Sequence, residues 1–414
     1  MIDACSQEAK RLLSLNEALE KIKAAIQPVS GSEKVMLKNA LGRVLSELVY
    51  SPINIPHDKN AAMDGYAFAS GDIAQQQAFT LSLAGTSWAG RPFQGQLEPG
   101  QCIRIFTGAV VPPEADSVIM QEHVQVHEQT VHFPADKKPR QNIREIGEDI
   151  KQGSLLCPHP KLLNAVDLGL LASAGICEVT VRRPVKIAFF STGDELTALG
   201  QPLESGKIYD SNRYSLTGLL ADACYSAVDL GVIPDDKQKL EDSLVEASKN
   251  YDAIITTGGA SVGEADYVKE VLESCGTVNF WKIAIKPGKP LAFGKIGQSY
   301  FFGLPGNPVA VITTFQQIVT PALKQLSGAP YSKPLQLTAT CTSTLKKAQG
   351  RQEFQRGILT QDDNGEFFVA SSGKQGSHIL SSMSQANCYI VLPSECKGIQ
   401  TGDKVTVEPF SLFI

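Results

Sequence analysis

The chain has 414 residues, of which 43% are hydrophobic and 20% are charged, a composition typical of a globular protein long enough for several domains. Lysine and arginine number 38 against 43 aspartates and glutamates, so the formal net charge is −5 and no overall basic field attracts nucleic acid or an anionic membrane. We therefore expect neither nucleic acid nor membrane as a partner, and small anions must be bound by local groups.

The cysteines and the N-terminal sequence indicate a cytoplasmic protein. Nine cysteines are scattered along the chain and none forms a C-x-x-C pair, which favours reduced thiols over a disulfide framework or a zinc site. The first residues are polar and amphipathic and lack the apolar segment of an export signal. No apolar run is long enough to cross a membrane.

The first part of the chain predicts helices around a small β domain. Apolar residues recur at helical spacing behind Ser14 and predict a helix over 14–26. Residues 32–50 are predicted to continue as strand and helix. A helix over 165–175 and a strand over 176–184 are predicted further on. We interpret these parts as a helical linker domain, formed by residues 1–51 and 143–182.

The inserted segment, residues 52–142, alternates short strand-like runs with Gly/Pro turns and predicts a small β domain. Asp64 lies in a tight Met-Asp-Gly-Tyr turn, and Thr107 ends a strand just before Gly108, although turn geometry alone would explain an Asp-Gly pair. Asp149 lies in another exposed turn beyond the segment. The histidines of a strand-like stretch are expected to face solvent rather than bind a metal: His123, His127 and His132.

Residues 183–328 predict a doubly wound, mostly parallel α/β domain. Nearly continuous apolar runs of strand length alternate with helix-like segments, as in parallel sheets covered on both faces. In such sheets, ligands bind at the carboxyl ends of the strands. The predicted strands are 185–192, 226–233, 251–258 and 299–306.

The third of these strands leads into a stretch that indicates an anion site. It ends at Gly258 and Gly259, continues through Ser261, and reaches Asp266 at the start of a predicted helix. Bare backbone N–H groups before a helix suit a phosphate or oxyanion. Glu264 stands where a P-loop needs lysine, and no G-x-G-x-x-G is present. A strand-to-helix turn with no ligand is the alternative.

Other strand ends add charged residues to the same predicted edge. Glu195 and Asp235 follow the first two strands, and together with Asp266 they suit Mg²⁺ holding a phosphate. Lys282 and Lys286 alternate onto one face of a predicted strand and suit the phosphate itself. Each carboxylate could instead cap a helix, and we expect Asp235 or Asp236 to cap the helix that follows.

Residues 329–414 predict a small all-β domain made of short strands with turn residues between them. It carries Arg356 and the small polar run that contains Ser377. An arginine and a serine hydroxyl can hold an oxyanion, although a solvated surface arginine is the alternative.

A series of segments, taken together, resembles the molybdopterin molybdenumtransferases, the bacterial MoeA family to which the gephyrin E domain also belongs. The segments follow one another in the family's order over almost the whole chain: NAAMDGYA, FTGAVVPPEAD, IREIGEDI, STGDEL, GKIYDSN, TTGGASVGEADYV, KPGKPLAFG, GLPGNP, GRQEFQRG and GSHILSS.

The resemblance implies an elongated homodimer of four-part subunits that ends in a C-terminal β barrel. It implies a reaction in which molybdate is inserted into adenylyl-molybdopterin with help from Mg²⁺ and AMP is released, the final step of molybdenum cofactor biosynthesis. The cleft is expected to combine the α/β domain of one subunit with the inserted domain of the other. A transient contact with the molybdopterin adenylyltransferase that supplies the substrate is also implied.

The resemblance assigns roles to matched positions. Glu195, Asp235 and Asp266 are expected at the nucleotide or Mg²⁺ end of the cleft. Substrate contacts are expected from the phosphate cradle, the two lysines, two loop-shaping prolines and the C-terminal domain: Gly258, Gly259, Ser261, Lys282, Lys286, Pro305, Pro308, Arg356 and Ser377. The linker and inserted domains are expected to supply Asp64, Thr107 and Asp149.

Two other functions fit parts of the sequence. A molybdopterin adenylyltransferase would resemble residues 183–328 but would not need the inserted and C-terminal domains. A pterin-binding scaffold without catalysis would not have to keep the acidic loops. A preference for tungstate over molybdate also stays open, because the two oxyanions are nearly isosteric.

Overall fold

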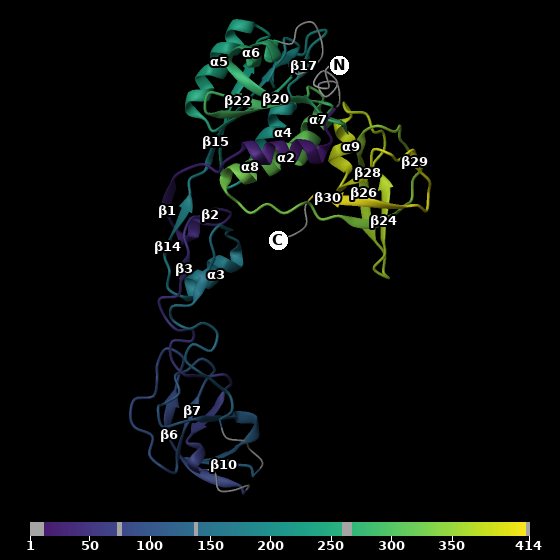
Figure 1. Cartoon of the computed structure of the whole chain (residues 1–414). Helices are drawn as coiled ribbons and strands as arrows, with labels where there is room; N and C mark the ends of the chain where they lie inside the picture. Colours follow the sequence, from purple (N-terminus) through teal and green to yellow (C-terminus); the bar gives the residue numbers. More distant parts are fainter. Residues whose placement is uncertain (1–11, 73–76, 136–139, 259–266, 411–414) are drawn as a thin grey trace, which may run out of the picture.

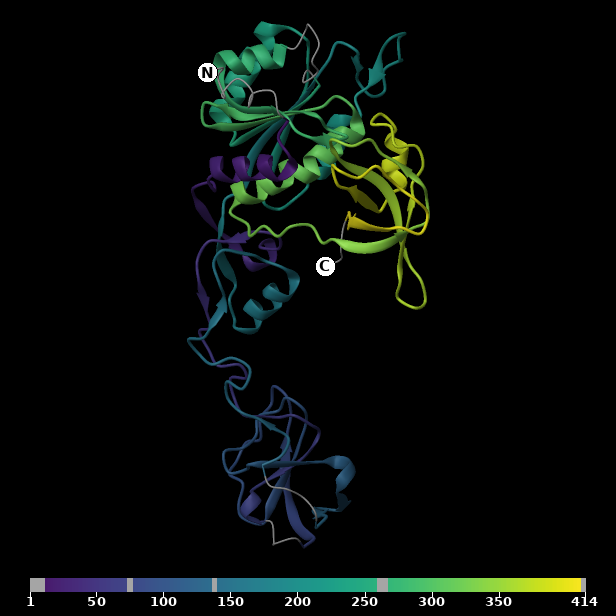
Figure 2. The same cartoon turned by 45° about the vertical axis from the view of Figure 1, so that its right-hand side comes forward.

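The computed structural model describes residues 12–72, 77–135, 140–258 and 267–410. The chain is elongated, with the α/β domain at one end, a linker in the middle and the inserted β domain at the other end (Figure 1). The C-terminal barrel packs beside the α/β domain, and the inserted domain stays remote from both when the view is turned (Figure 2). Among the described residues, none of the helices has the length and apolar content that crossing a bilayer requires.

The α/β domain has the predicted doubly wound, mostly parallel sheet. Its strands follow the order β18-β15-β19-β23-β22-β20, in which the first four are parallel and the last two are antiparallel additions at one edge. The bounds are β15 (Val185–Thr192), β18 (Tyr225–Ile233), β19 (Ala253–Thr257), β20 (Gly276–Lys282), β22 (Pro290–Ile296) and β23 (Ser299–Leu304).

Helices cover both faces of this sheet. Successive residues of each strand point to opposite faces, so the apolar residues of the strands need cover on both sides. On β15, Ile187 and Phe189 pack with one helical layer, whereas Ala188 and Phe190 pack with the other. The first layer contains α4 (Asn212–Leu219), α7 (Pro308–Thr314) and α8 (Thr320–Ser327), the last two joined by a π-helical turn over Phe315–Val319. The second contains α5 (Lys237–Asn250) and α6 (Tyr267–Cys275).

The predicted N-terminal helix is confirmed as α2 (Leu15–Ala25). Ser14 caps it in a capping box: its Oγ accepts from the Glu17 N–H at 3.2 Å, and Glu17 Oε2 accepts from the Ser14 N–H at 2.7 Å. The apolar side of α2, including Ala18 and Ile22, packs in the core of the α/β domain beside α8. The helix that was predicted within the linker domain thus packs against the α/β domain.

The linker is less helical than predicted. Residues 32–50 form β1 (Ser32–Met36), a 3₁₀ turn (Leu37–Asn39), β2 (Val44–Leu45) and β3 (Val49–Tyr50) instead of strand and helix. These strands pair with partners that arrive much later in the chain, so tertiary pairing overrides the local helical pattern. The remaining elements are β12 (Leu155–Cys157), β13 (Lys161–Leu162), α3 (Ala165–Ser173) and β14 (Glu178–Arg182).

The inserted domain is the predicted small β structure. Its sheet has the order β8-β5-β7-β6-β10-β9 and lies between two apolar clusters. The strands are β5 (Gly65–Phe68), β6 (Phe79–Ser87), β7 (Gln101–Ile105), β8 (Ser117–Met120), β9 (Gln125–His127) and β10 (Thr130–Phe133), and β4 (Asn60–Ala61) pairs with β11 (Ile143–Arg144) at the entrance. The prediction that the histidines face solvent is confirmed, since His123, His127 and His132 are all exposed.

The C-terminal domain is a closed five-stranded barrel. Strands β26, β27, β24, β30 and β28 follow one another around it, and pairing of β28 with β26 closes the ring. Their bounds are β24 (Leu337–Cys341), β26 (Gln352–Gln361), β27 (Phe367–Ser371), β28 (Cys388–Leu392) and β30 (Lys404–Pro409). Short elements complete it: β25 (Leu345–Lys346), α9 (Leu380–Gln385) and β29 (Gly398–Ile399). Phe354 and Tyr389 extend the core of the α/β domain into the barrel.

An ion pair at the junction of linker and α/β domain allows a stability prediction. Arg183 binds Asp252 bidentately at 2.7 and 2.9 Å, and the Lys186 N–H donates to Asp252 at 2.8 Å. Burial acts to raise the pKa of Asp252, but these donors outweigh it and the pKa lies below its usual value. We expect Asp252→Asn to lower the free energy of unfolding by about 2 kcal/mol at pH 7.

The lowered pKa of Asp252 also sets how this contribution to the free energy of unfolding depends on pH. Because the folded-state pKa of Asp252 is depressed, its contribution is present at neutral pH and disappears as the pH falls through the folded-state pKa. Urea unfolding of both proteins, compared at neutral and acidic pH, should show the difference shrinking with acidification. The exposed Asp363 supplies the control variant, Asp363→Asn. A difference that is constant with pH would mean that the ion pair does not stabilise the fold.

Candidate functional site

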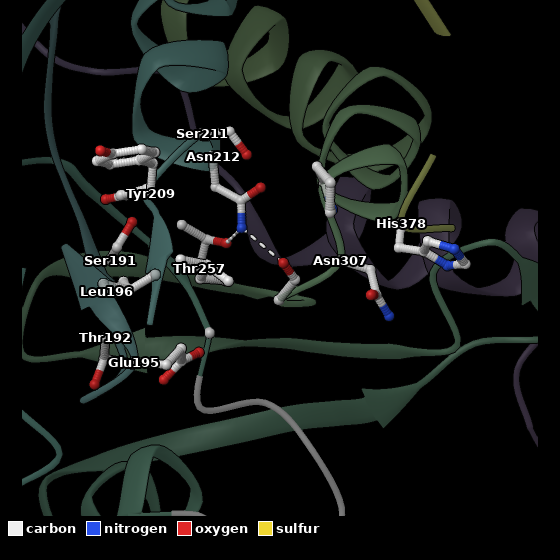
Figure 3. A pocket seen from close by; sticks show the side chains of 15 residues that line it. Ser191, Thr192, Glu195, Leu196, Tyr209, Ser211, Asn212, Thr257, Asn307 and His378 are labelled. Carbon is white, nitrogen blue, oxygen red and sulfur yellow. Dashed lines mark hydrogen bonds between the residues drawn. The ribbon is translucent and has the colours of Figure 1, made fainter. Parts of the chain in front are cut away.

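A cavity of about 350 Å³ lies at the carboxyl ends of β15, β19 and β23 (Figure 3). This is the edge where a doubly wound sheet binds ligands. Its walls come from the β15, β19 and β23 loops, the segment before α4 and one barrel loop. The lining residues are Ser191, Thr192, Glu195, Leu196, Ile208, Tyr209, Asp210, Ser211, Asn212, Thr257, Gly258, Gly306, Asn307, Pro308 and His378.

Two predicted carboxylates lie on neighbouring loops at this edge. Glu195 lines the cavity, and Asp235 borders it because the Thr192 hydroxyl donates to Asp235 Oδ1 at 2.5 Å. The Asp235 N–H in turn donates to Asp194 at 3.3 Å, which joins the two loops. The helix cap was predicted as either of two residues, and it is Asp236 that accepts from the Lys239 N–H. Asp235 thus remains directed to the Thr192 loop.

The predicted glycine cradle starts at the cavity wall. Gly258 has φ +89°, and a Cβ there would lie 2.2 Å from the carbonyl oxygen of Thr192. Only glycine fits, because the end of β19 passes so close to the end of β15. The rest of the predicted cradle, Gly259, Ser261 and Asp266, lies outside the described residues.

The two predicted prolines lie in the loop that follows β23. Pro308 lines the cavity and begins α7, whereas Pro305 contributes its carbonyl, which accepts from the buried Thr257 hydroxyl at 3.1 Å. Asn212 ties the same loops together, since its Nδ2 donates to Thr257 Oγ1 at 2.9 Å and to the Gly306 carbonyl at 2.8 Å (Figure 3).

The barrel reaches the cavity through the loop that carries Ser377 and His378. His378 lines the cavity, and the Ser377 carbonyl accepts from the Val309 N–H at 3.1 Å, so the loop is attached to α7. A pair of short strands, β16 (Leu196–Thr197) and β17 (Ile208–Tyr209), forms the wall nearest the first acidic loop.

Arg356 is not a solvated surface residue. Its side chain is 1% exposed. The guanidinium donates to the carbonyls of Lys374, Gln375 and Gly376 at 3.1 to 3.2 Å and to Ser382 Oγ at 3.1 and 3.2 Å. The sequence predicted a guanidinium that is presented to an oxyanion. In this structure, Arg356 instead holds the loop that carries Ser377. One of its two Nη1 protons takes part in none of these hydrogen bonds.

The two predicted lysines do not share one strand. β20 ends at Lys282, and Lys286 belongs to β21 (Ile285–Lys286), which leaves the sheet and pairs with barrel strand β26. Both lysines are nevertheless exposed, with buried Ile283 and Ile285 between them. Lys286 pairs with the buried Glu353 at 3.1 Å, so its charge is already balanced by the barrel. Neither lysine lines the cavity.

The residues predicted from the inserted and linker domains form a separate group. Asp64 Oδ1 accepts from the Thr107 N–H at 2.8 Å and from the Thr107 hydroxyl at 2.7 Å. The backbone bond, then the hydroxyl bond, lowers the pKa of Asp64, and the charge of Arg104 adds to this effect. Asp149 is exposed between linker and inserted domain. The inserted domain, which carries Asp64 and Thr107, lies away from the α/β domain that holds the cavity (Figures 1 and 2).

Comparison with known proteins extends over the whole chain. It is 46% identical to the molybdopterin molybdenumtransferase of Haemophilus influenzae over 97% of this chain and 99% of the relative. The chain belongs to the MoeA family of molybdopterin molybdenumtransferases. Residues 13–175 match the MoeA N-terminal region (domain I and II), 188–325 a probable molybdopterin binding domain, and 338–410 the MoeA C-terminal region (domain IV).

Other members agree with this assignment. The molybdopterin molybdenumtransferase of Nostoc is 35% identical over 91% of this chain and 88% of the relative. Gephyrin of Dictyostelium discoideum is 34% identical over 97% of this chain and 63% of its own length. The solved MoeA structure from Pyrococcus horikoshii superposes with a TM-score of 0.83 at 29% identity, covering 97% of this chain and all of the other.

Sequence reasoning about this MoeA family member missed much of the cavity wall. The matching segment GKIYDSN was noticed, but its Asp210 and Asn212 received no role, and neither did Ser191, Thr257 or His378. Their residue types are common at turns and caps. For Ser191 and Thr257 the usable signal was position, since each lies at the end of a predicted strand.

Proposed function

We propose that this MoeA family member inserts molybdate into adenylyl-molybdopterin and releases AMP. The observation that carries the proposal is the cavity at the strand ends of the probable molybdopterin binding domain, lined by Glu195 and bordered by Asp235. The molybdenumtransferase names of relatives that match nearly the full chain support the reaction.

The chain's own residues act by binding and orientation. The backbone at Gly258 approaches the ligand phosphate, and Thr192 keeps the Asp235 carboxylate directed to the first acidic loop. The loop carrying Ser377, held by Arg356 with its remaining Nη1 proton, is the proposed molybdate contact, and Lys282 and Lys286 add positive charge at the domain boundary. The dithiolate of the ligand supplies the sulfur atoms, so no protein nucleophile is needed.

Mg²⁺ is the proposed cofactor. No group of three or more His, Cys, Asp or Glu side chains suited to a metal occurs within the described part of the chain. Glu195 and Asp235 fit Mg²⁺ as oxygen donors on adjacent loops, and Asp266, outside the described residues, is the proposed third. When bound, Mg²⁺ would neutralise phosphate charge and so favour the departure of AMP.

A homodimer explains the separation of the two residue groups. The inserted domain, which carries Asp64 and Thr107, lies away from the α/β domain that holds the cavity (Figure 2), so a second copy is proposed to bring these residues to it. The edge strand β18 supports this, because Val228, Leu230 and Val232 are 37 to 40% exposed along it. Exposed apolar residues along an edge strand offer a surface on which another chain can pack.

We also propose a cytoplasmic location and a transient contact with the adenylyltransferase that makes the substrate. All eight cysteines of the described residues are free thiols, as expected of a reducing compartment. An adenylylated pterin is a reactive anhydride, so direct transfer between enzymes would limit its hydrolysis.

The test is AMP release from purified protein given adenylyl-molybdopterin and Mg²⁺, with and without molybdate. We expect release that depends on molybdate, and a parallel series with tungstate measures the preference between the oxyanions. Binding without cleavage would favour a scaffold, the alternative function. Formation of adenylyl-molybdopterin from ATP would favour an adenylyltransferase.

A further inference from the structure

Part of the cavity wall carries buried oxygen atoms that lack a hydrogen-bond partner. Among the described side chains that line the cavity, these atoms are Ser191 Oγ, Asp210 Oδ2 and Asn212 Oδ1. Ser191 is 1% exposed and Asp210 is 2% exposed. A buried polar atom without a partner is unfavourable, so such atoms collected around one cavity indicate groups that a ligand satisfies.

The orientation of the Asn212 amide follows from its neighbours. Its Nδ2 faces the Gly306 carbonyl, which can only accept, and Thr257 Oγ1, whose proton is directed to the Pro305 carbonyl (Figure 3). A flipped amide would place oxygen against oxygen. Asn212 Oδ1 is therefore a fixed acceptor, because both Nδ2 protons are engaged by Thr257 and Gly306.

Asp210 offers a second fixed acceptor. Its Oδ1 accepts from the Arg213 N–H at 3.2 Å at the start of α4. Its Oδ2 lies 3.3 Å from Arg213 Nε without hydrogen-bond alignment. Arg213 also pairs with Asp229 Oδ1 at 3.4 Å, so the two aspartates share its charge. An anion is disfavoured at this wall, whereas a neutral ring edge rich in N–H groups fits it.

We propose that Asp210 and Asn212 determine the specificity of the cavity by accepting hydrogen bonds from the amino-pyrimidinone edge of the pterin ring. That edge presents a 2-amino group beside an N3–H, two donors in a row. Adenine presents one amino group between two ring acceptors, which would face the acceptor oxygens of this wall. The inference rests on the proposed function, which supplies a ligand with both rings.

The assignment also orients the ligand. Figure 3 shows Thr192 and Glu195 at the opposite end of the cavity from Asn212. The pterin ring therefore lies toward the segment before α4, and the phosphates lie toward the acidic loop of β15. This orientation separates the anionic part of the ligand from the Asp210 carboxylate.

The experiment compares 6-hydroxymethylpterin with 6-hydroxymethyllumazine, in which an oxo group replaces the 2-amino group. Calorimetric or fluorescence titration of the full chain should show about tenfold tighter binding of the pterin. In Asp210→Asn, Oδ1 still accepts from the Arg213 N–H, but an NH₂ group replaces Oδ2. The ratio of the affinities for pterin and lumazine should therefore fall to about unity or reverse. A merely structural role of Asp210 would weaken both ligands equally.

Asp229→Asn is the matched control, because Asp229 neighbours the same Arg213 but does not line the cavity. It should keep the wild-type preference. AMP and inosine monophosphate differ at the adenine amino group. Asp210→Asn should change the affinity of the protein for the two nucleotides equally. A change confined to that pair would place adenine at this wall and overturn the assignment.

Other results overturn it as well. These are equal binding of pterin and lumazine by the wild type, binding of neither at millimolar concentration, or a preference that persists in Asp210→Asn. Molybdate-dependent AMP release is measured on the same preparations. Release without a pterin preference contradicts only this inference, whereas a pterin preference without release contradicts only the proposed function.

Discussion

Replacing Arg356 with methionine is expected to reduce molybdate-dependent AMP release by about a hundredfold or more. The guanidinium is the buried support of the loop that carries Ser377 and His378, and methionine removes its bonds to three carbonyls and to Ser382. The free energy of unfolding should fall by about 3 kcal/mol, since several buried acceptors lose their donors. Activity assays and urea unfolding measure the two effects.

Binding measurements distinguish a misplaced Ser377 loop from general unfolding of the Arg356→Met protein. The Arg356→Met protein should keep its affinity for AMP, because the nucleotide-end residues lie on β15 and β18 loops of the other domain. Arg356→Lys should not restore activity, since one ammonium cannot reach the same set of acceptors. Arg351→Met is the control, because Arg351 is only partly buried and lies just before the same strand, β26. Full activity of Arg356→Met would show that the loop needs no such support.

Mixing two inactive variants should restore activity if the site combines two subunits. Asp64→Ala and Glu195→Gln are each expected to lower AMP release by about a hundredfold or more in their own dimers, through loss of transition-state interactions. In a random mixture, half of the dimers are mixed, and each mixed dimer has one intact site of two. About a quarter of the wild-type activity should therefore return.

The result depends on verified mixed dimers. Each variant carries a different affinity tag, and sequential purification isolates the mixed species before the assay, where about half of wild-type activity is expected. A mixed dimer as inactive as its parents would mean that Asp64 and Glu195 act within one chain. A doubly substituted chain mixed with wild type gives the matching reference.

The architecture of the α/β domain was predictable because its strands are buried on both faces. Nearly continuous apolar runs such as 185–192 and 253–257 have few other environments, and the loops at their carboxyl ends lie at one edge in any parallel sheet. The grouping of Glu195 with Asp235 followed from this rule. The capping box at Ser14 likewise marked the start of α2.

Local pattern was insufficient where partners arrive from distant parts of the chain. Residues 32–50 were predicted to continue as strand and helix, but β1 pairs with β14. The helix α2, predicted within the linker domain, packs into the α/β core. The run that holds both lysines was predicted as one strand. It divides after Lys282, because Ile283 and Ala284 bond to Leu13 and β21 then pairs with barrel strand β26.

The sequence by itself determined the order of the domains, the parallel sheet, the edge at which the cavity lies and several of its charged residues, because burial periodicity and strand-end chemistry are local properties. Only the tertiary structure decided which groups are free to act. It buried Arg356 against carbonyls, paired Lys286 with Glu353, and left one oxygen each of Asp210 and Asn212 at the cavity wall without a hydrogen-bond partner. Whether a polar group is already satisfied depends on neighbours that folding brings from elsewhere in the chain.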